Sequence, residues 1–256
     1  MKSPFRLPAA LAASCLALLA SPVLADGNAA SRLSNVQFST LDLTPDDGAA
    51  AGYEIVAIAN SQVFASYSQR GNPGEQNFFL EPYQPGVARV DYGPSFGEGS
   101  TSGAIGALDT RARGTAELDT FGHAGAHSIQ RVLLTLRPNT VLIVGGHVDT
   151  LATADFDRMR YDAVSRVDVG LIDAAGRRVD MAQISYTSVD GGIDELHDDF
   201  ALRYENSSAN DLAVTLDLHA QAAVFAIPEP ASWAMLSAGL LLLGAAGKRR
   251  TASRGK

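Results

Sequence analysis

The chain has 256 residues, of which 46% are hydrophobic, and it carries 20 basic and 28 acidic side chains. Residues 26–230 contain all 28 acidic side chains, thirteen arginines and no lysine, and therefore have a net charge of −15. Such a charge repels nucleic acid and anionic membranes and favours solubility, so nucleic acid is excluded as a partner.

The first 25 residues have the pattern of a secretory signal peptide. Lys2 and Arg6 precede an apolar stretch at residues 7–20, and the small residue Ala25 stands immediately before Asp26. This order of a basic, an apolar and a small-residue region predicts cleavage by signal peptidase after Ala25. The mature chain is therefore expected to be exported and to begin at Asp26.

The only cysteine of the chain, Cys15, lies inside this segment. A bacterial lipoprotein also has a cysteine after an apolar run, but Ala12 stands where a bulky aliphatic residue is expected, and apolar residues continue past Cys15. We therefore favour cleavage after Ala25. The mature chain then has no thiol, and it can form neither a disulfide nor a cysteine-based metal or catalytic site.

Residues 26–226 are long enough for one domain, or for one domain with a small insertion. Their hydrophobic residues recur with the period of two that is typical of half-buried strands. Strands are predicted at residues 35–43, 52–68, 132–136, 141–144, 166–173, 179–186 and 211–225. Many short strands separated by turns, without a convincing amphipathic helix, indicate an all-β fold, an antiparallel β-sandwich.

Two hairpins are predicted from the turn sequences between these strands. Pro138 and Asn139 separate the strands at 132–136 and 141–144, and the sequence DAAGRR separates those at 166–173 and 179–186. Residues 91–128 are rich in Gly, Ser and Ala, and they fit either a long loop or strands of small residues.

Three histidines and one aspartate are candidates for metal binding or acid–base catalysis. His123 and His127 are four residues apart, but no glutamate lies between them as in the zinc motif H-E-x-x-H, so a solvated loop pair is expected. His147 and Asp149 lie on one face at the end of a predicted strand. An acid–base pair needs a partnered nucleophile. The G-x-S-x-G string at residues 93–97, GPSFG, is not followed by a predicted helix, as a serine elbow requires. His147 is therefore expected to be a polar strand-end residue and the chain not to be an enzyme.

Two acidic segments can be interpreted either as calcium-binding loops or as solvated turns. The sequence DGGIDELHDD supplies Asp190, Asp194, Glu195 and Asp198 as candidate calcium ligands, with Asp199 beside them, since calcium takes six to eight oxygen ligands. A second acidic turn contains Asp46 and Asp47. The spacing differs from that of an EF-hand, so the other interpretation is that these residues are solvated turn acids and that no cofactor binds.

The C-terminal segment combines an apolar run with basic residues. Residues 231–247 are uncharged and are followed by Lys248, Arg249 and Arg250. The run is at the short end of the roughly 17–25 residues of a single transmembrane helix. Because basic residues prefer the cytoplasmic side, residues 251–256 are expected inside and residues 26–226 outside. A permanent membrane anchor is one interpretation.

The C-terminal segment has four parts in order: the triplet Pro228-Glu229-Pro230, Trp233, the apolar run, and the basic residues Lys248, Arg249 and Arg250. Together they resemble the PEP-CTERM sorting signal of exopolysaccharide-producing Gram-negative bacteria. The resemblance implies that residues 227–250 are recognised by an exosortase, which removes the tail near the triplet after a transient stay in the membrane. Two prolines hold the backbone extended, which suits a protease-like site. In this interpretation Glu229 and its prolines are substrate residues.

Residues 33–55, 134–146 and 200–222 also look like an uncharacterised β-rich ectodomain type that recurs among PEP-CTERM proteins. The resemblance implies a non-enzymatic surface or extracellular-matrix protein of the cell envelope that is associated with exopolysaccharide or biofilm. One alternative is a carbohydrate-binding, lectin-like and calcium-dependent module, and another is a secreted hydrolase. The expected order is signal peptide (1–25), extracytoplasmic domain (26–226), sorting signal (227–250) and cytoplasmic tail (251–256).

Overall fold

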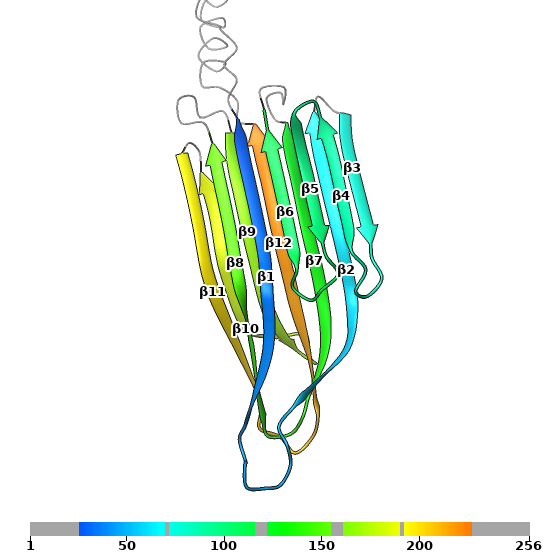
Figure 1. Ribbon diagram of the computed structural model, residues 1–256, viewed down its shortest axis with the longest axis vertical. Helices are drawn as coiled ribbons and strands as arrows, with labels where there is room; N and C mark the ends of the chain where they lie inside the picture. Colours follow the sequence, from blue (N-terminus) through cyan, green and yellow to red (C-terminus); the bar gives the residue numbers. More distant parts are fainter. Residues whose placement is uncertain (1–25, 70–71, 116–121, 155–160, 190–191, 227–256) are drawn as a thin grey trace, which may run out of the picture.

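The computed structural model describes residues 26–69, 72–115, 122–154, 161–189 and 192–226 (Figure 1). The predicted signal peptide, the sorting signal and the cytoplasmic tail lie outside these residues. Among the described residues, no helix is long and apolar enough to cross a membrane.

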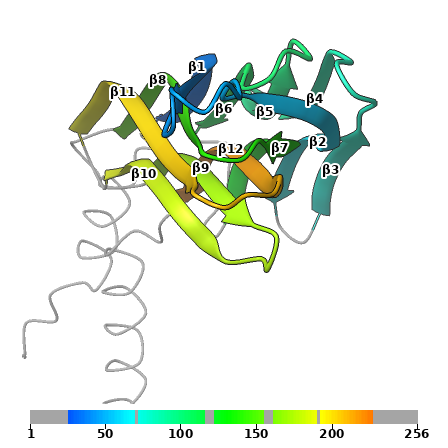
Figure 2. The same cartoon turned by 90° about the horizontal axis from the view of Figure 1, so that it is seen from below.

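In the described residues, twelve antiparallel strands form two six-stranded sheets that pack face to face (Figure 2). Sheet A has the order β11 (Gly192–Asn206), β8 (Thr140–Ala154), β1 (Gly27–Asp42), β6 (Leu108–Gly114), β5 (Ser95–Thr101) and β4 (Gly86–Tyr92). Sheet B has the order β10 (Arg178–Val189), β9 (Tyr161–Asp173), β12 (Leu212–Ala226), β7 (His123–Leu136), β2 (Tyr53–Gln69) and β3 (Asn72–Phe79). The predicted all-β antiparallel sandwich is confirmed for the described residues.

One of the two predicted hairpins is present and the other is wrong. Strands β9 and β10 pair as predicted, with Arg178 opposite Ile172. Residues 132–136 and 141–144, however, belong to β7 of sheet B and β8 of sheet A, so the turn between them carries the chain from one sheet to the other. Hydrophobic alternation shows which face of a strand is buried, but it does not show which neighbour the strand pairs with.

The interior changes in character along the long axis of the sandwich. Large aliphatic side chains such as Leu134, Leu142 and Leu216 fill one half. Small side chains such as Ala152 and Ala222 fill the other half, around the buried ring of Tyr161.

The segment rich in Gly, Ser and Ala forms strands of small residues, which is one of the two alternatives from the sequence. Strands β5 and β6 lie within it. A Cβ atom on Gly97 would lie 2.2 Å from the carbonyl oxygen of Gly125, and one on Gly99 would lie 2.7 Å from that of His127. The backbones of the two sheets approach so closely here that side chains would not fit between them.

Both ends of the folded body lie at the same end of the sandwich, which we call the termini end (Figure 1). A Cβ atom on Gly27, at the start of β1, would lie 2.7 Å from Val224, near the end of β12. Asp26 forms a 2.6 Å ion pair with Arg113. The turns at residues 43–52, 137–139 and 207–211 lie at the opposite end, which we call the turn end.

Candidate functional site

A cluster of histidines and carboxylates lies on the outer face of sheet A, where β8 pairs with β11. Successive side chains of a strand alternate between faces, so Val148 and Thr150 of β8 are buried while His147 and Asp149 point outward. The antiparallel register places His197 of β11 opposite Asp149, and Asp199 opposite His147. The expected common face of His147 and Asp149 is confirmed, but the expected strand end is wrong, because β8 continues to Ala154.

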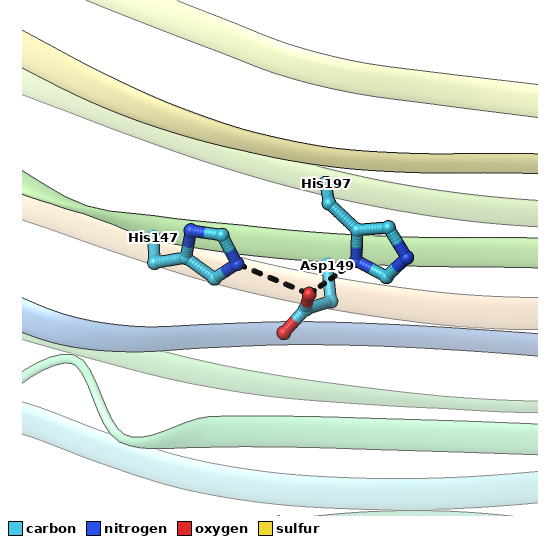
Figure 3. Close-up of side chains that lie close together, drawn as sticks. All are labelled: His147, Asp149 and His197. Carbon is cyan, nitrogen blue, oxygen red and sulfur yellow. Dashed lines mark hydrogen bonds and ion pairs between the residues drawn. The ribbon is translucent and has the colours of Figure 1, made fainter.

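The carboxylate of Asp149 lies between the two imidazole rings (Figure 3). Its Oδ1 atom is 3.2 Å from Nε2 of His147 and 2.5 Å from Nδ1 of His197. The second nitrogen of each ring faces another carboxylate. Nδ1 of His147 is 2.7 Å from Oδ1 of Asp199, and Nε2 of His197 is 2.9 Å from Oε1 of Glu195.

The carboxylates set the charge of the two rings. The hydrogen bond to Asp199, followed by the charge of Asp149, raises the pKa of His147 above its usual value. Hydrogen bonds to Asp149 and then Glu195 raise the pKa of His197. In return, the hydrogen bond from His197 lowers the pKa of Asp149. The site is partly open to water, since 33% of the His147 side chain and 57% of the His197 side chain are exposed.

This arrangement suits cation binding better than nucleophilic catalysis. His147, Asp149 and His197 each supply one ligand atom, and these three atoms lie within 4.8 Å of one another. A histidine that activates a hydroxyl nucleophile needs one ring nitrogen directed at that hydroxyl. Here all four ring nitrogens face carboxylates.

The residues expected in an acidic calcium loop do not form a loop. Asp190 lies outside the described residues, whereas Asp194, Glu195 and Asp198 lie on β11, which pairs residue by residue with β8. Strand alternation places Asp194 and Asp198 on one face and Glu195 on the other. The expected loop is therefore wrong, and the described part of the set does not converge on one point.

The second acidic segment is a hydrogen-bonded turn. Asp47 accepts hydrogen bonds from Oγ1 of Thr44 at 2.6 Å and from the backbone N–H of Ala49 at 2.7 Å. The bond from Thr44 is the main reason that the pKa of Asp47 is lowered. Asp47 thus stabilises the turn between β1 and β2, in the way that Asx side chains do in many turns.

His123 and His127 lie on β7, and the expected solvated loop is wrong. The ring of His127 stacks on Phe64 of β2 with the ring centroids 4.5 Å apart. Burial, and then the charge of His219, lowers the pKa of His127 to about 4. The alternation of β7 begins at His123, whereas only residues 132–136 were predicted as a strand.

The predicted processing residues lie outside the described part of the chain, except for Asp26. They are Ala25, Pro228, Glu229, Pro230, Trp233, Lys248, Arg249 and Arg250. Sequence reasoning also missed His197 as a site residue, and it considered Asp199 only as part of the acidic calcium loop. The alternating patterns H-x-D at 147–149 and E-x-H-x-D at 195–199 were the available signal, since each pattern places its polar residues on one face of a strand.

No family model and no curated protein matches the chain. Among solved structures, the chain is similar to the crystal structure of a "putative secreted protein" from Parabacteroides distasonis ATCC 8503. The two chains are 9% identical, the similarity covers 80% of this chain and 74% of that one, and the TM-score is 0.16. A similarity at this level carries no argument about fold or function, so the site is interpreted from its own geometry.

Proposed function

We propose that the chain is an exported, non-enzymatic surface or matrix protein that is sorted by its C-terminal signal in a Gram-negative bacterium. Signal peptidase cuts after Ala25, and an exosortase removes the tail near Pro228-Glu229-Pro230. The β-sandwich then acts in the exopolysaccharide layer or biofilm. The sequence of the tail motivates the proposal, and the arrangement of the folded body supports it.

The position of the two ends of the body is the observation that carries the proposal. The start of β1 and the end of β12 are side by side at the termini end, as the approach of Gly27 to Val224 demonstrates. Strand β12 ends at Ala226, only two residues before Pro228. A transient membrane helix after the triplet would hold the sandwich by this end alone. The turn end would then project away from the membrane by about 50 Å, the length of the 15-residue strand β12.

The geometry of the histidine cluster does not support an enzyme with a histidine-activated hydroxyl nucleophile. Each ring nitrogen of His147 and His197 faces a carboxylate, so neither ring is directed at a hydroxyl nucleophile. The side face on which the cluster lies stays accessible when the sandwich is held by its termini end.

A carbohydrate-binding module is a second candidate, and exposed aromatic rings favour it. Phe78 and Phe79 end β3, and Tyr83 follows in the next turn; Phe79 is 72% exposed and Tyr83 is 59% exposed. Exposed aromatic rings give large contact areas at little cost in conformational entropy. If this candidate is correct, Phe79→Ser combined with Tyr83→Ser should abolish retention on the host's purified exopolysaccharide, whereas equal retention would contradict it.

The sorting proposal is tested with a C-terminal epitope tag and the change of Glu229 and Pro230 to alanine. This change leaves the apolar run and its basic residues intact, so a permanent anchor should be unaffected. Under the proposal, the mature wild-type protein lacks the tag, whereas the variant accumulates as a tagged membrane form.

The chain supplies a matched control for this experiment. Glu81 and Pro82 form a second Glu-Pro pair, and both residues are exposed in the turn after β3. Changing them to alanine should leave processing as in the wild type. A tag that persists on the mature wild-type protein would overturn the proposal.

A further inference from the structure

We propose that His147, Asp149 and His197 bind one zinc ion on the outer face of sheet A. Zinc binding at this site is a property of the folded body and does not depend on how the tail is processed.

The spacing of the donor atoms is close to what zinc requires. Zinc–nitrogen bonds of about 2.05 Å that meet at the tetrahedral angle place two donors about 3.3 Å apart. Nε2 of His147 is 3.2 Å from Oδ1 of Asp149, and all three donor atoms lie within 4.8 Å of one another. Nδ1 of His197 is 2.5 Å from the same oxygen. Zinc binding therefore requires the exposed His197 ring to move outward, until this distance is about 3.3 Å.

The outer carboxylates orient both rings for metal binding. A carboxylate only accepts hydrogen bonds, so Nδ1 of His147 donates to Asp199 and Nε2 of His197 donates to Glu195. The inner nitrogens face the same oxygen of Asp149, and each of them must carry either a proton or a metal ion. Metal-ligating histidines characteristically donate their other N–H to a carboxylate or a carbonyl, which fixes the tautomer.

The site rests on a rigid part of the fold. His147 and Asp149 are two residues apart on β8, and His197 lies directly opposite Asp149 on β11. Strand β8 also pairs with β1 on its other side, which places Arg32 opposite Asp149. Asp149, Glu195 and Asp199 supply three negative charges. Two arginines lie nearby, Arg32 and Arg111, and Arg111 is paired with Asp109. The carboxylates therefore outnumber the arginines, and the local charge favours a cation.

The ligand set distinguishes zinc from calcium. Calcium takes six to eight oxygen ligands, whereas two imidazole nitrogens and one carboxylate are a typical zinc set. Three protein ligands also leave a coordination position open to the solvent. Other divalent transition metals can bind such a set, so the test uses zinc and, as its spectroscopic substitute, cobalt.

The test uses the chain purified in detergent through a tag that contains no histidine and stripped of metal with a chelator. Equilibrium dialysis should give one zinc ion per chain, and cobalt should produce the strong visible absorption of a tetrahedral site. Zinc should also raise the melting temperature, because a ligand that binds only the folded state stabilises it. Calcium should do neither.

Variants locate the ion. His197→Ala should weaken zinc binding at least about 100-fold, and Glu195→Ala about 10-fold through loss of ring orientation. The exposed position of His197 keeps the variant folded, and an unchanged melting temperature in chelator verifies this. His219 is the matched control, since it also lies near a carboxylate, Asp168, but on sheet B. His219→Gln should bind zinc as the wild type does.

Three results would overturn the proposal. They are a stoichiometry well below one, wild-type affinity in His197→Ala, and loss of binding in His219→Gln.

Discussion

Gly97 and Gly99 on β5 mark a place where the backbones of the two sheets approach closely. An added Cβ atom would meet backbone oxygen atoms of Gly125 or His127, and neither can rotate away as a flexible side chain can. The absence of a side chain at these positions therefore allows the packing of β5 on β7.

We predict that Gly97→Ala lowers the free energy of unfolding by about 3 kcal/mol or more, because the sheets must separate to admit the methyl group. The control is Gly170→Ala, where a Cβ atom would have no neighbour closer than 3.9 Å. That change should stay within about 0.5 kcal/mol. Chemical denaturation measures both, and equal midpoints would contradict the close approach.

His127 gives a second prediction at the scale of single residues, about how the stability of the protein depends on pH. Burial, and then His219, lowers its pKa to about 4 in the folded protein, against an ordinary value of 6.5. Protonation therefore favours the unfolded chain, and the contribution of His127 to stability is complete above pH 6.5 and falls progressively toward pH 4.

His127→Gln removes this titration, so its melting temperature should fall less than that of the wild type between pH 6.5 and 4. His123→Gln provides a comparison, because burial also lowers the pKa of His123, but to a smaller degree. Parallel pH curves for His127→Gln and the wild type would show that the ring is not buried.

The strands themselves were largely predictable, because an apolar residue at every second position is a local property of the sequence. Strand β12 alternates as predicted, with Leu216 and Leu218 buried. Strands β3, β4 and β11 were not predicted. Strand β11 was missed because its first half has polar residues on both faces. Asp194 and Asp198 lie on the same face as the buried Phe200 and Leu202, yet they are exposed at the edge of the sheet. Charged residues are typical of edge strands.

The pairing of the strands was not predictable in the same way. The turn from β7 to β8 resembles a hairpin in sequence, but it connects the two sheets, and a buried side chain from another strand holds it. Nδ2 of Asn206, at the end of β11, lies within 3.0 Å of the carbonyl oxygens of Leu136, Arg137 and Asn210.

We predict that Asn206→Ala lowers the free energy of unfolding by about 2–3 kcal/mol, since it leaves buried carbonyl groups without donors. Ser207, its exposed neighbour, is the matched control, and Ser207→Ala should change stability by less than about 0.5 kcal/mol. Thermal melts of the two variants test this. If Ser207→Ala lowered stability as much as Asn206→Ala does, the effect would come from the turn sequence and not from the side-chain hydrogen bonds of Asn206.

At the scale of the whole molecule, the fold brings together residues that lie far apart in the sequence. His147 and His197 are 50 positions apart, and only the pairing of β8 with β11 makes them neighbours. The pair H-x-D was recognised from the sequence as lying on one face of a strand, but its partner pattern was assigned to a loop. A site shared by two strands could not be predicted until their pairing and register were known.

The proposed function also depends on the arrangement of the whole molecule. The start of β1 and the end of β12 meet at the termini end, at one end of a long sandwich (Figure 1). This arrangement suits a body that is held briefly by the membrane and then released or transferred.

The most direct test of the proposed processing is the intact mass of the protein isolated from the cell envelope and from the medium. We predict a single mature species that begins at Asp26 and has lost Trp233 and everything after it, since the exosortase cuts near Pro228-Glu229-Pro230. A mature species that begins at Asp26 but retains the residues up to Lys256 would contradict exosortase processing and would indicate a permanent anchor.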